Sequence, residues 1–239
     1  MSRIDPLRGR LARRDLLKIT GAAAGTAALG NLTGPGTLPA RAAPARQDAA
    51  SAIIFGVGTD VDELDPRTTD TQEGYIVASN VYDCLVLYDL GATTIRPGLA
   101  ESWEISEDGL VYTFTLRQGV SFHDGEPFNA DAVTTWYNSI DEEAPDTQYD
   151  ATRMVYVADF ITTWIDSVEA VDELTVRMTL PEPYAPLLAN LAIPIAGIPS
   201  PAALAQGLDH LAVNPSGTGA FSLASPDDWT RDSQMVLQA

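Results

Sequence analysis

The most constraining feature of the chain is a stretch from Leu99 to Ile140 that combines a hairpin, a turn and a capped helix. Apolar and polar side chains alternate in its first half with the period of two that predicts a half-buried strand. The apolar members are Leu110, Tyr112, Phe114 and Leu116. The run 106–109 before them ends in Gly109 and predicts a tight turn. This part of the chain therefore predicts a β-hairpin.

A capped amphipathic helix is predicted in the second half of the same stretch. Asn129 follows the turn His123-Asp124-Gly125 and is well placed to cap a helix. Apolar residues then recur at spacings of three and four, the pattern of one helix face. They are Val133, Trp136, Tyr137 and Ile140.

Further elements are expected on both sides of this stretch. Apolar patterning and turn residues indicate a buried strand at 52–57, a helix at 72–84, a short strand at 85–88, a second hairpin from strands 165–171 and 174–180, and a short apolar helix at 187–193. The resulting class is α/β, with helices and mixed sheets in the α+β sense.

The first 46 residues differ in charge from the rest of the chain. They hold eight of the fourteen basic residues and two of the thirty-three acidic ones. A twin-arginine export pattern is formed by Arg13, Arg14, Leu16, Leu17 and Lys18. Ala40 and Ala42 form an A-x-A cleavage site. We expect a twin-arginine signal peptide and linker at 1–46 and an exported protein, either cleaved near Ala43 or anchored by an uncleaved leader; the alternative is an incidentally basic N-terminus.

The remainder of the chain is strongly acidic, with six arginines, no lysine and thirty-one acidic residues. Nucleic acids and anionic membranes would be repelled by such a surface, so we exclude them as partners. Two interpretations stay open: a solvated acidic surface without specific role, or an electrostatic preference for cationic solutes.

Motifs for catalysis, metal binding or cofactors are not evident in the sequence. Cys84 is the single cysteine and is expected to be a core thiol. His123 and His210 have no neighbouring cysteine, and no nucleophile elbow, phosphate loop or zinc-protease motif occurs. We therefore predict a protein that is not an enzyme and that needs no cofactor or metal.

The stretch described first resembles the signature of the family 5 extracytoplasmic solute-binding proteins, the dipeptide, oligopeptide and nickel receptors of ABC importers. The strongest matches are Gly98–Trp103, Ser106–Gly109, Tyr112–Leu116 and Phe122–Phe128. Weaker matches lie at 64–66, 82–89, 167–171, 182–186 and 217–221. The resemblance covers nearly everything after the leader.

The resemblance implies a type II periplasmic-binding-protein-like fold in which a second lobe follows the first. It places a discontinuous first lobe at 51–79 and 196–239 and an inserted accessory domain at 80–195. Family members are more than twice as long, so we expect either a truncated gene product or an incomplete sequence, and little ligand binding by residues 43–239 alone.

In function, the resemblance implies a monomeric receptor that captures a short peptide or related small solute and delivers it to ABC permease subunits. Such receptors hold a peptide by main-chain hydrogen bonds between two lobes. The expected contacts are Thr59 and Asp60 after the first strand, Tyr75, and Gly217, Thr218 and Gly219. Ordinary turn chemistry is the alternative for the turn residues. A non-binding remnant, a nickel or metal-chelate receptor of the same family, and a secreted hydrolase are the competing functions.

Overall fold

The computed structural model describes residues 54–89, 91, 93–141, 150 and 153–239. The chain divides into two units, Met1–Ile54 and Phe55–Ala239, and all the elements below belong to the second. The predicted signal peptide, with its twin-arginine motif and its cleavage site at Ala40 and Ala42, lies outside the described residues. Within the described residues, no helix is both long enough and apolar enough to span a bilayer.

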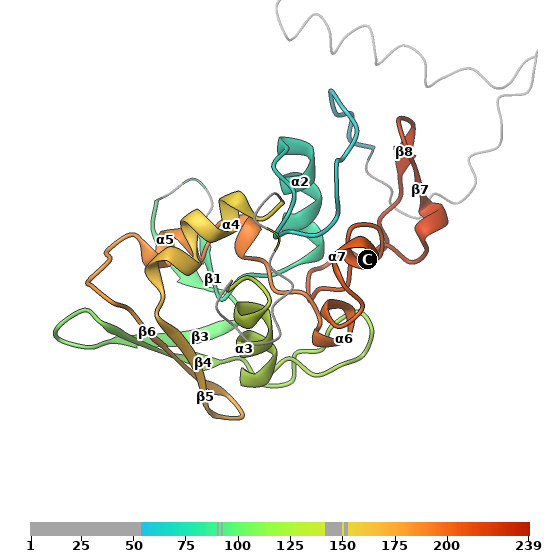
Figure 1. Cartoon of the computed structure of the whole chain (residues 1–239). Helices are drawn as coiled ribbons and strands as arrows, with labels where there is room; N and C mark the ends of the chain where they lie inside the picture. Colours follow the sequence, from blue (N-terminus) through green and yellow to red (C-terminus); the bar gives the residue numbers. More distant parts are fainter. Residues whose placement is uncertain (1–53, 90, 92, 142–149, 151–152) are drawn as a thin grey trace, which may run out of the picture. The chain divides into compact units, whose positions relative to one another are not determined.

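Two hairpins join to form a four-stranded antiparallel sheet (Figure 1). Strands β3 (Ala100–Ile105) and β4 (Val111–Leu116) form the first hairpin, and β5 (Ser167–Asp172) and β6 (Thr175–Thr179) form the second. The strand order is β3-β4-β6-β5, so the later strand of each hairpin pairs at the centre. Both hairpins were predicted, whereas their pairing with one another was not.

The main hydrophobic core lies between this sheet and helix α3 (Ala130–Asn138). Alternate residues of β4 and β6 are buried, as their patterns predict. Phe114, Val176 and Met178 are fully buried. Trp136 of α3 is also fully buried. The predicted cap is confirmed, because the Asn129 side chain accepts a hydrogen bond from Ala132 N at 3.0 Å.

Short helices and a two-stranded sheet complete this unit. Strands β1 (Val86–Tyr88) and β2 (Ile95–Pro97) pair antiparallel. The short helical elements are α4 (Val155–Phe160), η1 (Thr162–Trp164), α5 (Leu187–Asn190), η2 (Pro194–Ala196), α6 (Pro201–Leu204), α7 (Leu208–Leu211) and η3 (Pro226–Asp228).

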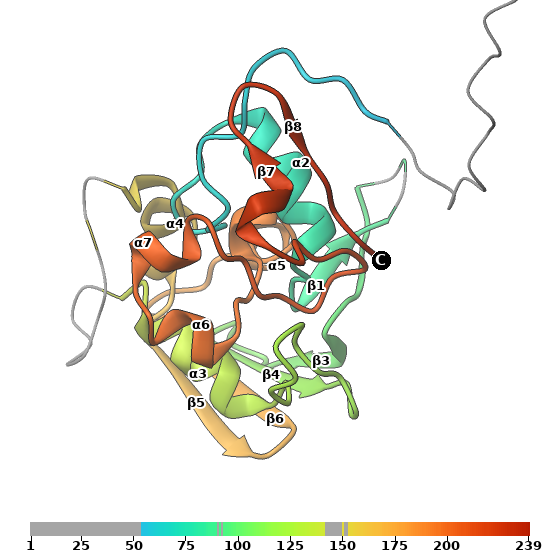
Figure 2. The same ribbon diagram turned by 90° about the vertical axis from the view of Figure 1, so that its right-hand side faces the viewer.

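Helix α2 (Gln72–Val81) belongs to a second, smaller cluster of buried residues. The Thr71 side chain caps the helix by accepting a hydrogen bond from Gly74 N at 3.0 Å. In Figure 1 the chain that precedes α2 runs between α2 and the C-terminal hairpin of β7 (Trp229–Thr230) and β8 (Gln234–Met235), and in Figure 2 the hairpin lies in front of α2. Leu237, after β8, packs against the cluster. The smaller cluster thus joins α2 to the end of the chain.

One predicted element is wrong. The described part of the predicted buried strand, Ile54–Val57, forms no strand, and Ile54 and Phe55 are 95% and 70% exposed. An apolar run predicts burial only if a partner strand or a packing surface is available, and within the described residues this segment pairs with none.

Candidate functional site

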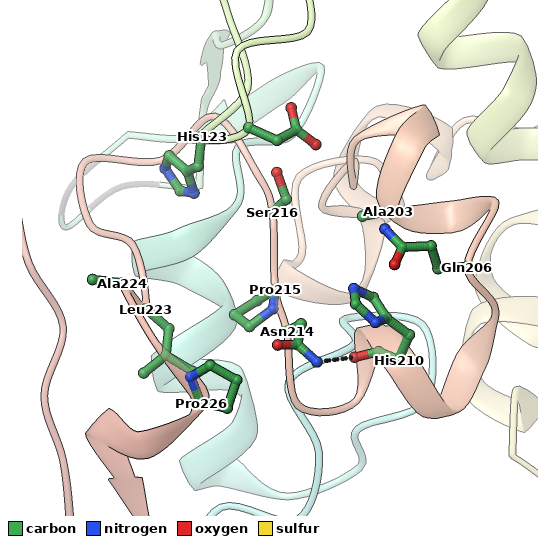
Figure 3. A pocket seen from close by; sticks show the side chains of 11 residues that line it. His123, Ala203, Gln206, His210, Asn214, Pro215, Ser216, Leu223, Ala224 and Pro226 are labelled. Carbon is green, nitrogen blue, oxygen red and sulfur yellow. Dashed lines mark hydrogen bonds between the residues drawn. The ribbon is translucent and has the colours of Figure 1, made fainter.

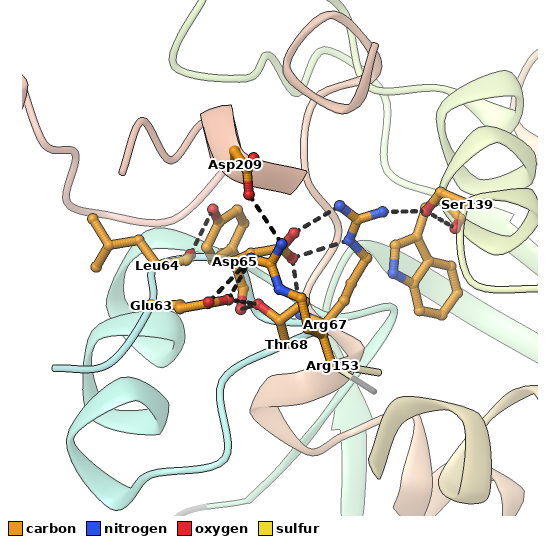
Figure 4. Close-up of polar contacts among 10 residues, drawn as sticks. Glu63, Leu64, Asp65, Arg67, Thr68, Ser139, Arg153 and Asp209 are labelled. Atoms are coloured by element: carbon orange, nitrogen blue, oxygen red, sulfur yellow. Dashed lines mark hydrogen bonds and ion pairs between the residues drawn. The ribbon is translucent and has the colours of Figure 1, made fainter. Parts of the chain in front are cut away.

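The segment Leu64-Asp65-Pro66 anchors the start of the described chain to distant elements (Figure 4). Asp65 accepts three hydrogen bonds from Arg67, one of them from Nη2 to Oδ2 at 2.7 Å, and neither side chain has exposed surface. Arg67 Nη1 also donates to the Ser139 hydroxyl at 2.8 Å, directly after α3. A buried ion pair in which all three guanidinium nitrogens donate a hydrogen bond fixes the course of the chain before α2.

A second, partly exposed ion-pair network lies next to this anchor. Arg153 pairs with Glu63 at 2.9 Å and with Asp209 at 3.1 Å. Thr68 donates a short hydrogen bond to Glu63. These contacts connect the chain before α2 with α7 and with Arg153, which lies two residues before α4, as Figure 4 shows.

The candidate ligand residue Asp60 is held by the hairpin of β7 and β8, through Trp229 of β7 and Asp232 of the turn. Its two carboxylate oxygens accept hydrogen bonds from Trp229 Nε1 at 3.4 Å and from Asp232 N at 2.9 Å. The bond from the Asp232 amide is the main reason that the pKa of Asp60 lies below its ordinary value. Arg231 lies 3.6 Å from the centre of the Trp229 ring and also donates to the carbonyl of Val61 at 2.7 Å. Asp60 is therefore fixed by the protein itself.

Asp62 connects residues 59–62, which we call the arm, to the N-terminus of α2. Its Oδ1 accepts hydrogen bonds from the Thr69 and Thr71 hydroxyls at 2.6 and 2.7 Å, and its Oδ2 accepts one from Asp70 N at 3.1 Å. Burial opposes ionisation of this carboxyl, but the hydrogen bonds outweigh it and lower the pKa of Asp62. The arm 59–62 consequently has a defined position relative to α2.

Gly217 and Gly219 lie against the C-terminal end of α2. A Cβ added at Gly217 would lie 2.2 Å from the Val81 carbonyl oxygen, and one at Gly219 would lie 2.4 Å from the Asn80 carbonyl oxygen. Both positions require glycine because the chain's own backbone approaches so closely. The amide of Gly219 also donates to Val81 O at 2.9 Å.

His123 holds the same glycine segment from the opposite side. Its amide donates to Gly217 O at 2.9 Å, Nδ1 accepts from Gly217 N at 3.3 Å, and Nε2 lies 2.9 Å from Gly219 O. This arrangement requires a neutral imidazole with its proton on Nε2. The imidazole thus bonds a segment 94 residues away in the sequence rather than its own turn.

Between the two glycines, Thr218 keeps its main-chain groups available. Its hydroxyl donates to Asp83 Oδ2 at 3.1 Å, whereas no described residue bonds its amide or its carbonyl. Thr59 is exposed and Tyr75 is half-buried on α2.

The structure does not bring all six candidate residues to one point. Thr59 and Asp60 belong to the arm 59–62, which is hydrogen-bonded to the N-terminal end of α2. Residues 217–219 instead pack against the C-terminal end of α2. A ten-residue helix is about 15 Å long, so an extended ligand could contact both groups, whereas a compact one could not.

Sequence reasoning missed the residues that fix these candidates, namely Trp229, Arg231, Asp232 and Arg67. The contacts of Asp60 span about 170 positions, and no local pattern encodes them. The glycines at 217 and 219 were the one available signal, because paired glycines indicate close backbone approach.

The described residues were compared with the requirements of a metal site and of a reactive thiol. No group of three or more His, Cys, Asp or Glu residues there is arranged to hold a metal ion. Cys84 is buried as predicted, its thiol lies 3.3 Å from Ile193 O, and burial raises its pKa to about 12. Such a thiol is inert near neutral pH.

Comparison with known proteins shows the family. The sequence profile described as "Bacterial extracellular solute-binding proteins, family 5 Middle" matches residues 94–239. The glutathione-binding protein GsiB of Pectobacterium atrosepticum is 37% identical over 174 residues, which are 72% of this chain and 32% of that protein.

Two solved structures are also similar. The periplasmic binding protein DppA of Helicobacter pylori, in complex with the peptide STSA, has a TM-score of 0.65 and 35% identity, over 75% of this chain and 37% of that one. NikA of Brucella suis, in complex with Fe(III)-EDTA, has a TM-score of 0.60 and 31% identity, over 72% and 32%.

The chain belongs to the family 5 bacterial extracellular solute-binding proteins. This is a family of binding proteins for transport rather than of enzymes. The chain spans about one third of the length of the relatives that it matches. The mixed α/β fold predicted from the sequence is confirmed, and the described strand pairs are all antiparallel.

Proposed function

We propose that the protein is the extracytoplasmic substrate-binding component of an ABC importer and captures short peptides for transport. The observation that carries this proposal is the similarity to a binding protein solved with a tetrapeptide, at 35% identity over 75% of the chain. The relative named for glutathione binding, itself a tripeptide, supports the same class of ligand. ABC permease subunits are the proposed membrane partners, and the receptor acts as a monomer.

The proposed mechanism is closure of two lobes on the ligand, which shifts an equilibrium between open and closed states. In this proposal residues 51–79 and 196–239 form a discontinuous first lobe, and 80–195 form an accessory domain. The hydrogen bonds of Asp60 with Trp229 and Asp232 support the joining of the two segments of this first lobe.

The proposed peptide contacts are Thr59, Asp60, Tyr75 and the segment 217–219. Peptide main chains are bound by hydrogen bonds to unpaired backbone groups, and Thr218 has an amide and a carbonyl that no described residue bonds. The hydrogen bonds from Asp232 to Asp60 and from His123 to the glycine segment hold both ends of this surface in place before ligand binds. Preorganisation of this kind lowers the entropic cost of binding.

Ligand carried by the native protein tests the proposal. The protein that contains this sequence is purified from its exported fraction without denaturation, and the ligand released by acid is analysed by mass spectrometry. We expect peptides of two to four residues. A bound nickel or metal chelate would instead favour the second candidate, a metal receptor, which the similarity to NikA supports. Ligand-free protein that also fails to bind added peptides would favour a non-binding remnant.

Export by the twin-arginine route is part of the proposal. Arg13 and Arg14 followed by Leu16, Leu17 and Lys18 support it. Replacing both arginines by lysine keeps the charge and should leave the precursor in the cytoplasm, whereas Arg8→Lys with Arg10→Lys is the matched control and should be exported. Export of the Arg13→Lys, Arg14→Lys variant would contradict this route.

A further inference from the structure

A hollow of about 250 Å³ lies between the turn that carries His123 and the helices α6 and α7 (Figure 3). Both histidines of the chain line it, and we call it the two-histidine pocket. Its lining residues with polar side chains are His123, Asp124, Gln206, His210, Asn214 and Ser216. None of the residues proposed as peptide contacts lines the pocket.

Ser216 is the unusual member of the lining. The residue is only 8% exposed, and its hydroxyl is buried without a hydrogen-bond partner among the described residues. Figure 3 places it between His123 and His210. Buried hydroxyls are normally hydrogen-bonded, so an unpaired one in a pocket wall indicates a partner that the protein itself does not supply.

The pocket lining offers several acceptor atoms that no described residue bonds. Asn214 Nδ2 donates to His210 O at 3.2 Å, and Gln206 Nε2 donates to Ala202 O at 3.4 Å, which leaves both amide oxygens unbonded by any described residue. Asp124 Oδ1 accepts from Glu126 N at 3.1 Å, and its second oxygen has no described partner.

The charge and the volume of the pocket further restrict the class of ligand that it could hold. Asp124 is the one carboxylate in the lining, and the whole chain has a net charge of −19, so the local and the long-range fields both favour a cation. The volume lies below the roughly 300–1,000 Å³ of pockets for drug-sized ligands. Apolar side chains complete the lining and suit a hydrocarbon body: Ala203, Pro215, Leu223, Ala224 and Pro226.

We propose that the two-histidine pocket is a second binding site, distinct from the proposed peptide site, for a small organic cation. The ligand is a primary amine or amidine with a compact apolar body. Its cationic head donates to the Asp124 carboxylate, to the amide oxygens and to the Ser216 hydroxyl oxygen, and its body contacts the apolar part of the lining.

Benzylamine is a suitable probe, with benzyl alcohol as its neutral counterpart of similar shape. Titration of the full chain at about 0.15 M salt, followed by NMR or calorimetry, should give saturable binding of benzylamine and clearly weaker binding of benzyl alcohol. Asp124→Asn should weaken benzylamine binding at least about threefold, the size expected for loss of an exposed ion pair.

Asp172→Asn is the matched control. Asp172 is also an exposed turn carboxylate that accepts from the amide two residues later, Leu174 N at 2.9 Å, and its replacement changes the net charge equally. It should leave benzylamine affinity unchanged. No saturable binding, equal binding of the alcohol, or equal weakening by Asp124→Asn and Asp172→Asn would overturn the proposal.

Ser216→Ala tests the pocket independently of charge. Removal of an unpaired buried hydroxyl should not lower the stability of the ligand-free chain, but it should weaken benzylamine binding about threefold. A stable Ser216→Ala chain with unchanged benzylamine affinity would overturn the part assigned to this hydroxyl.

Discussion

The guanidinium of Arg67 and the carboxylate of Asp65 form an ion pair with no exposed side-chain surface, with Nη2 2.7 Å from Oδ2. The same guanidinium reaches Ser139 at the end of α3. The pair therefore connects the segment that leads into α2 with the core packed on the four-stranded sheet. Both candidate ligand segments depend on the resulting position of α2.

Loss of Arg67 should be strongly destabilising. Arg67→Met leaves the Asp65 carboxylate buried without its partner, and such changes cost about 3–5 kcal/mol. Arg177→Met is the matched control, because Arg177 pairs with Glu169 at 3.6 Å on the surface and should cost no more than about 1 kcal/mol. Urea unfolding measures both, and equal losses would contradict the role given to the buried pair.

The close approach of Gly219 to α2 gives a second prediction. A Cβ there would overlap the Asn80 carbonyl oxygen at 2.4 Å and the Val81 carbonyl carbon at 2.6 Å, so Gly219→Ala should destabilise by about 1–3 kcal/mol. Gly56→Ala introduces a Cβ with nothing within 4 Å and should change stability by less than about 0.5 kcal/mol. Thermal unfolding compares them; a neutral Gly219→Ala would show that α2 and the glycine segment are not packed this way.

The clamp made by His123 predicts a local change in hydrogen exchange. His123→Phe removes the acceptor of the Gly217 amide, so exchange at Gly217 should accelerate about three- to tenfold, the equivalent of one hydrogen bond. The Leu64 amide, which bonds Ala212 O at 3.0 Å and does not contact His123, serves as the internal control. Equal protection of Gly217 in both chains would mean that the imidazole does not hold it.

The lowered pKa of Asp60 predicts a pH effect on the hairpin that holds it. A carboxyl with a depressed pKa in the folded state stabilises that state above its ordinary pKa of about 3.8 and loses the contribution as the pH falls through the folded value. Trp229→Phe removes the indole donor but leaves the Asp232 amide, so the pKa of Asp60 should rise only part of the way towards 3.8.

Carboxyl carbon chemical shifts measured against pH report this pKa directly. Asp108, whose pKa is lowered chiefly by the Ser106 hydroxyl, should titrate identically in both chains. An Asp60 pKa at its ordinary value in the unmodified chain would contradict the contact between the hairpin and the arm.

The sequence predicted those parts of the fold whose pattern is local. Alternation in β4 placed Phe114 in the core, and Asn129 capped α3 as its position indicates. The pairing of β4 with β6 joins strands about sixty residues apart, which no period in either strand specifies. Apolar content predicted burial at 54–57, but an apolar run without a partner strand stays exposed.

The candidate site was less predictable for the same reason. Thr59, Asp60 and the glycine segment were selected from the resemblance, yet the residues that position them lie far away in sequence. Trp229 and Asp232 reach Asp60, and His123 reaches Gly217, across about 170 and 94 positions. Only the three-dimensional fold brings these groups into contact, so sequence patterns could nominate the segments but not their supports.

Peptide binding by the native protein is the most direct test of the proposed function. The protein that contains this sequence is freed of bound ligand and titrated by calorimetry with di- and tripeptides, with the nickel–histidine chelate as the comparison. The proposal predicts saturable peptide binding with a dissociation constant in the micromolar range or tighter, about −8 kcal/mol or more favourable, and no comparable binding of the chelate. Tight chelate binding without peptide binding would contradict it.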